Sequence, residues 1–126
     1  MTRTQKAFLI LSGLLLMIAA QLGALGSHAF NDTLTPQQIT NWQLAVQYQM
    51  VHALGVVVIC WLTDKFPTAG IFVIAGWLML LGIVLFCGSI YISSFIGKGF
   101  ISALAPFGGS SLMLAWLLIA IGVWRQ

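Results

Sequence analysis

The side chains in this sequence that could do chemistry are two histidines and several glutamines, set within long apolar stretches. Gln21 and His28 are seven residues apart, and Tyr48 and His52 are four apart. In an α-helix both spacings place the two side chains on one face. Amide and imidazole groups in such positions can bond to one another, bind a ligand or, for histidine, pass a proton. Which of these happens depends on the helices that hold them.

The position of the charges predicts those helices. The chain has 126 residues, of which 60% are hydrophobic and 6% charged. The uncharged stretches are 7–31, 33–63, 66–97 and 99–124. Each exceeds the roughly 20 residues that a membrane-spanning helix needs, and none comfortably holds two. So little chain remains outside four spans that soluble catalytic, nucleotide-binding and nucleic-acid-binding domains are excluded.

We therefore predict an all-α integral membrane protein, a bundle of four transmembrane helices that forms a single domain over 1–126. The expected helices are about 7–29, 36–62, 69–92 and 101–124. A capping box, Thr35-Pro36-Gln37-Gln38, marks the start of the second. The fourth begins either at Ile101, with a kink at Pro106, or at Pro106 itself. Trp42 suits the aromatic belt at the membrane surface.

Lysine and arginine near the ends of the spans predict the orientation. Lys98 alone falls on one side of the membrane. The other four basic residues fall on the opposite side: Arg3, Lys6, Lys65 and Arg125. This bias predicts that both termini lie in the cytoplasm, and it accounts for the net charge of +3 without a nucleic-acid partner.

Depth along the helices, counted at 1.5 Å per residue, places most polar side chains in the outer half of the bundle. The candidate ligand-binding residues are Gln21, His28, Tyr48, Gln49, His52, Ser89 and Ser110. A Gln21–His52 or a Tyr48–His52 hydrogen bond is expected. Two interpretations stay open, because intramembrane polar groups mark ligand or proton sites but also hold helices together.

Small residues predict where helices approach closely. Ala19, Gly23 and Ser27 recur every four residues, a spacing that lets a neighbouring backbone pack against the helix. Gly88, Gly108 and Gly109 suit the same role in the third and fourth helices. These positions predict helix packing, within the chain or with a partner, and no chemistry of their own.

The residues do not form a catalytic or metal-binding set. Both acidic residues, Asp32 and Asp64, fall in loops, so no Ser-His-acid arrangement is possible in the membrane. Zinc needs three or four ligands, and His28 and His52 differ in depth by roughly 13 Å. We expect a protein that is not an enzyme and that carries no metal or cofactor.

An ordered set of motifs gives a resemblance over nearly the whole chain. The motifs are Gly23-Ala24-Leu25-Gly26-Ser27-His28-Ala29, Trp42, Ala45-Val46-Gln47-Tyr48-Gln49, His52-Ala53, Phe86-Cys87-Gly88-Ser89-Ile90-Tyr91 and Ala105-Pro106-Phe107-Gly108-Gly109. Together they resemble a small bacterial inner-membrane family with a domain of unknown function, related to the eukaryotic transmembrane-protein-256-like proteins. The resemblance implies a four-helix membrane protein and supplies no biochemical activity.

Three functions fit these expectations. The first is a non-enzymatic scaffold or accessory subunit of a membrane complex, which would bind a partner membrane protein or further copies of itself through its helices. The second is a lipid- or quinone-binding protein with a polar pocket in the outer half of the bundle. The third is a small oligomeric transporter. Membrane lipid is an expected partner in every case, and nucleic acid is not.

Overall fold

The computed structural model describes residues 1–126 and consists of four long helices and one short 3-10 turn. These are α1 (Arg3–His28), α2 (Pro36–Lys65), α3 (Ile71–Ile96), η1 (Ser102–Leu104) and α4 (Ala105–Trp124). All four long helices are long and apolar enough to cross a membrane. The predicted all-helical, four-span architecture is confirmed.

Capping residues explain where the first two helices begin. The capping box at Thr35 and Gln38 forms as predicted, with each side chain bonded to the other's backbone N–H. A second box, which the sequence analysis missed, joins Thr2 and Gln5, so α1 begins at Arg3 and not near residue 7. Side chains that satisfy the free N–H groups of the first turn extend a helix beyond its apolar stretch.

Several other helix ends differ from the predicted bounds, although α4 ends at Trp124 as expected. α2 and α3 continue to Lys65 and Ile96, three or four residues further than expected, and α3 begins at Ile71. Gly97, with φ of 81°, ends α3, because this backbone conformation favours glycine. For the fourth helix, starts at Ile101 and at Pro106 were both expected, and each is partly right. The short helix η1 begins at Ser102 and leads directly into α4, and Pro106 lies in the first turn of α4.

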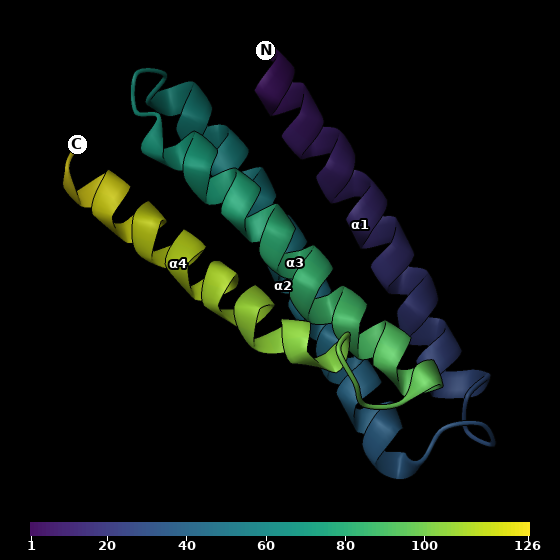
Figure 1. The fold of residues 1–126 in the computed structure, drawn as a ribbon. Helices are drawn as coiled ribbons and strands as arrows, with labels where there is room; N and C mark the ends of the chain where they lie inside the picture. Colours follow the sequence, from purple (N-terminus) through teal and green to yellow (C-terminus); the bar gives the residue numbers. More distant parts are fainter.

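α2 and α3 lie side by side at the centre of the molecule, with α1 on one flank and α4 on the other (Figure 1). α1 packs mainly on α2, and α4 packs mainly on α3. The N- and C-termini lie at the same end of the molecule (Figure 1). The main core is built from all four helices and includes Phe8, Ile59, Phe72, Met79 and Leu112.

Close helix contacts occur at only some of the predicted small residues. A Cβ on Gly108 would collide with the backbone of Phe86, and Ala19 is fully buried. On Gly23 the added atom would lie 3.3 Å from Cγ1 of Val46. Gly88 is not a packing residue, because no atom lies within 4 Å of the position a Cβ would take.

Gly109 and Gly26 correct the predicted packing set. A Cβ on Gly109 would meet only Cδ2 of Phe86 at 3.8 Å, an ordinary contact. Ser27 is exposed, but its Oγ accepts from Nε2 of Gln43 at 3.3 Å, so it does contact α2. The tightest small residue against α2 is instead Gly26, where a Cβ would come within 2.5 Å of Trp42. Trp42 itself is buried, with 2% of its surface exposed, and so does not form part of a lipid-facing aromatic belt.

Candidate functional site

Gln49 is the centre of a hydrogen-bonded cluster that joins three helices. It lies on α2, and only 2% of its surface is exposed. Its Nε2 donates to the backbone oxygen of Leu15 in α1 at 2.7 Å. Its Oε1 accepts from the hydroxyl of Tyr91 in α3, also at 2.7 Å. Both ends of the amide are therefore partnered within the protein, and the arrangement is that of a structural bond between helices.

Two further side chains of α2, both nearer the start of that helix than Gln49, donate to α1. The indole N–H of Trp42 donates to the oxygen of Leu22 at 2.7 Å. Gln43 Nε2 lies 3.3 Å from Oγ of Ser27 and 3.4 Å from the oxygen of Gly23. Every fully buried polar side-chain atom in the protein has a partner. Between α1 and α2 the polar groups are thus used for packing.

His52 lies apart from the Gln49 cluster, on the side of α2 that faces α4. Its Nδ1 is 2.7 Å from the backbone oxygen of Tyr48, one helical turn earlier. The imidazole contacts two other aromatic rings, with centroid distances of 5.5 Å to Tyr48 and 5.9 Å to Trp116. The expected Tyr48–His52 bond therefore exists, but its acceptor is the backbone oxygen and not the phenol.

The expected Gln21–His52 hydrogen bond is wrong. Gln21 and His28 are both exposed on the outer face of α1, and neither side chain has a hydrogen-bond partner in the chain. With Ala24, Leu25 and Ala29 they line a shallow groove of about 520 Å³. Matching depth on two neighbouring helices does not make residues neighbours, because the rotation of α1 turns this face away from α2.

The two predicted serines bond within their own helices. Ser89 donates to the oxygen of Phe86, and Ser110 donates to that of Pro106, both at 2.9 Å. The serine that joins two helices is Ser111, whose Oγ donates to the oxygen of Leu78 in α3 at 2.6 Å. Its spacing from Gly108 places both on one face of α4, and this signal could have identified it. The seven predicted residues therefore do not form one cluster, because only Gln21 with His28 and Tyr48 with His52 lie together.

Tyr91 was also missed as a site residue. Its hydroxyl completes the bonding of Gln49, and its ring lies 4.7 Å from that of Trp42. A groove of about 220 Å³ runs beside it, between α1 and α3, and includes Gln49 and Gly88 in its lining. The missing side chain at Gly88 leaves part of this space open.

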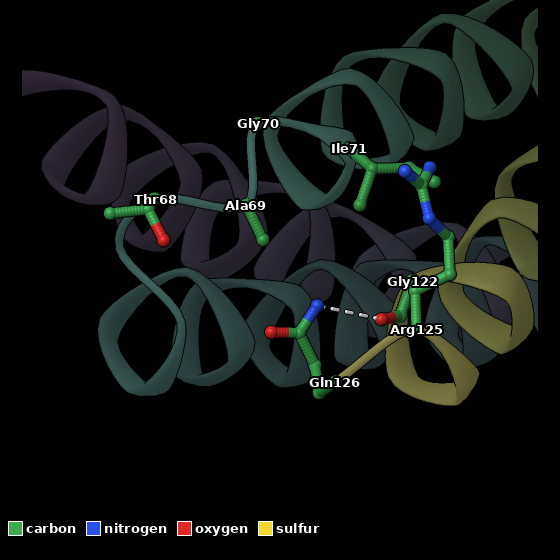
Figure 2. A pocket seen from close by; sticks show the side chains of 7 residues that line it. All are labelled: Thr68, Ala69, Gly70, Ile71, Gly122, Arg125 and Gln126. Carbon is green, nitrogen blue, oxygen red and sulfur yellow. Dashed lines mark hydrogen bonds between the residues drawn. The ribbon is translucent and has the colours of Figure 1, made fainter.

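A different hollow lies at the end of the molecule that carries the termini, between the α2–α3 turn and the end of α4 (Figure 2). Its volume is about 330 Å³, and its lining includes Gly70, Ile71 and Arg125. Figure 2 shows Gln126 folding back to donate to the oxygen of Gly122, at 2.9 Å. No predicted site residue lies here.

Four apolar helices joined by internal hydrogen bonds define the class, a multi-pass integral membrane protein. The profile of the family described as "Protein of unknown function (DUF423)" matches residues 22–109. The chain therefore belongs to the DUF423 family, which confirms the predicted membership of a bacterial membrane family of this kind.

Similar proteins in other bacteria are described as membrane proteins. The chain is 39% identical to the UPF0382 membrane protein YwdK of Bacillus subtilis, over 92% of this chain and 94% of that protein. It is 36% identical to a UPF0382 membrane protein of Staphylococcus haemolyticus, over 95% of this chain and 97% of that one. No solved structure matches the chain significantly.

Proposed function

We propose that this protein is a non-enzymatic accessory subunit or scaffold of a membrane complex, which binds a partner membrane protein through the outer face of α1. We further propose that it lies in the bacterial inner membrane with both termini in the cytoplasm, as the distribution of lysine and arginine favours. The observation that supports the accessory role is Gln21, an amide without an intramolecular partner on an exposed helix face.

An amide without a partner is unfavourable at the depth where Gln21 lies. Gln21 lies seven residues before His28, at the outer end of α1, so it is roughly 10 Å inside the membrane surface. The hydrocarbon region offers no water, and an amide there is stabilised by bonding to another helix. Ala24 lies beside it and leaves room for a close approach. α1 is also the least covered helix, with 17% of its most apolar segment buried.

Photo-crosslinking in native membranes tests the proposal. A photoreactive residue at Ala24 is compared with one at Leu117, which is exposed on α4. We expect one discrete adduct with another membrane protein from Ala24, and none from Leu117. Gln21→Leu should remove the adduct, because it removes the hydrogen-bonding group while keeping an apolar surface.

Three other outcomes contradict the accessory role. Adducts of equal yield from both positions would mean unselective contact with neighbours. An adduct of twice the chain's mass would assign the face to a second copy. An adduct with another protein that survives Gln21→Leu would mean that the amide does not hold the partner. Native mass spectrometry from native-lipid nanodiscs identifies what is bound.

Lipid binding is a second candidate, favoured by the groove between α1 and α3. Its volume of about 220 Å³ and its mostly hydrophobic lining suit part of an acyl chain. Gly88→Leu should fill the space and reduce copurifying lipid, whereas Gly13→Leu, also in open surroundings, should not. We place the oligomeric transporter last, because the polar groups between α1, α2 and α3 bond to one another.

A further inference from the structure

His52 has one ring nitrogen that the protein does not use. Its Nδ1 lies 2.7 Å from the backbone oxygen of Tyr48. A carbonyl oxygen only accepts, so in the neutral ring Nδ1 carries the proton and Nε2 presents a lone pair. No protein group donates to Nε2. Since every fully buried polar side-chain atom has a partner, Nε2 is not fully buried and belongs to the 8% of the His52 surface that is exposed.

The surroundings of this nitrogen are aromatic. The ring of Tyr48 stacks on that of Phe86 at 4.8 Å and lies 5.5 Å from the imidazole. Trp116 of α4 approaches the imidazole edge-on at 5.9 Å. Tyr48 and Trp116 are 39% and 40% exposed, so both also face the bilayer. A flat apolar molecule that arrives from the membrane would meet aromatic ring surfaces beside the acceptor.

The depth of His52 in the membrane limits which molecules can donate a hydrogen bond to its Nε2. Trp42 packs beside Gly26, two residues before the end of α1, and so marks the level at which α1 ends. His52 is ten residues beyond Trp42 in α2, or roughly 15 Å along the helix axis, which is close to the middle of a hydrocarbon layer about 30 Å thick. Phospholipid headgroups and glycerol oxygens stay at the membrane surface, so they do not reach this nitrogen. A hydroxyl at this depth must be carried by a small, membrane-soluble molecule.

From these three observations we propose that His52, Tyr48 and Trp116 form a binding site for a membrane-soluble hydroquinone or related phenol. The ligand's hydroxyl donates to Nε2 of His52, and its ring lies against the aromatic side chains. The oxidised quinone carries carbonyl oxygens, which accept and do not donate, so the site prefers the reduced form. The proposal concerns binding alone, and both hydroxyls keep their protons.

The test uses the full chain, labelled with ¹⁵N-histidine, in nanodiscs of synthetic phosphatidylcholine and phosphatidylglycerol. The probe is 2,3-dimethyl-1,4-naphthohydroquinone under argon, and its matched control is the corresponding dimethyl ether, which lacks donors. We expect the hydroquinone to move the Nε2 resonance of His52 and to leave His28 unchanged. The ether should bind about tenfold more weakly, the effect of one lost hydrogen bond.

Variants locate the site. His52→Phe keeps a ring and removes the acceptor, so it should weaken hydroquinone binding about tenfold and leave the ether unaffected. His28→Phe is the matched control and should change neither. Trp116→Leu removes one wall and should weaken both compounds. Helix content and elution volume identify variants that fail to fold, and the comparison of the two compounds on the unaltered chain does not depend on them.

Several results would overturn this site. They are equal affinity for the hydroquinone and its ether, a His52 resonance that does not move at saturation, or no binding at all. A resonance that already reports a hydrogen bond without the probe would mean that another group occupies Nε2. The site does not rest on the α1 contact, and Gln21→Leu should leave probe binding unchanged, so the two proposals fail separately.

Discussion

The hydroxyl of Tyr91 in α3 donates to Oε1 of Gln49 in α2 at 2.7 Å, and the same amide donates to the backbone of Leu15 in α1. One buried side chain thus fixes the positions of three helices relative to one another. In the membrane such bonds contribute about 0.6 kcal/mol on average and up to about 1.7 kcal/mol. The Gln49 cluster therefore mainly stabilises the fold and is not a site for chemistry.

The first prediction concerns this bond. Tyr91→Phe should lower the free energy of unfolding by about 0.6–1.7 kcal/mol. Gln49→Leu should cost more, about 1–3 kcal/mol, because it leaves the Tyr91 hydroxyl buried without an acceptor. Unfolding in mixed detergent–SDS micelles, followed by circular dichroism, measures both. Tyr48→Phe is the control, since the Tyr48 hydroxyl makes no hydrogen bond, and an equal loss there would refute the assignment.

The second prediction concerns Gly108 and Gly88, to which the sequence analysis assigned the same packing role. Gly108→Ala should destabilise the protein, because overpacking costs about 1–3 kcal/mol and the obstacle is the backbone of Phe86, which cannot rotate away. Gly88→Ala should be neutral or slightly stabilising, since its surroundings are open and alanine is the better helix former. The same unfolding assay decides, and equal effects would contradict the described α3–α4 contact.

The third prediction concerns Trp42, which is buried and bonded to the backbone of Leu22. Trp42→Phe removes the donor and leaves a gap beside Gly26, so we expect a loss of about 1–3 kcal/mol. Trp124→Phe is the matched control, because 87% of Trp124 is exposed. If Trp42 instead lay at the lipid surface, Trp42→Phe and Trp124→Phe would have the same stability.

The fourth prediction is the orientation. Lys98→Cys should react with a membrane-impermeant maleimide in intact spheroplasts, whereas Gln126→Cys should react only after the membrane is disrupted. The unaltered chain is the background control, since Cys60 and Cys87 are free but buried. Labelling of Gln126→Cys in intact spheroplasts, without labelling of Lys98→Cys, would reverse the proposed topology.

The sequence predicted the spans well because charges are excluded from the hydrocarbon region, so Asp32 and Lys98 mark loops and Asp64 marks the end of α2. It predicted the faces of the helices poorly. A soluble helix reveals its inner face by its apolar stripe, but a membrane helix is apolar all round. Gln21 and Gln49 therefore looked equivalent, although one points outward and the other is buried.

The same reason explains the corrected hydrogen bonds. Depth can be counted along a chain, whereas rotation about the helix axis depends on how neighbours pack. Gly26 and Gly108 determine that rotation through close contacts with Trp42 and with the backbone of Phe86. Gly88 is also a glycine, but it has no such close neighbour. Residue type alone did not distinguish these positions.

The donors of α2 have a consequence for how this protein can evolve. Trp42, Gln43 and Gln49 all reach backbone oxygens of α1, at Leu22, Gly23 and Leu15. Every residue type supplies that oxygen, so these attachments survive exchange of the α1 side chains that bear them, as long as the helices still approach. Selection on the outward face of α1 can therefore change what it recognises while α1 keeps its place in the fold.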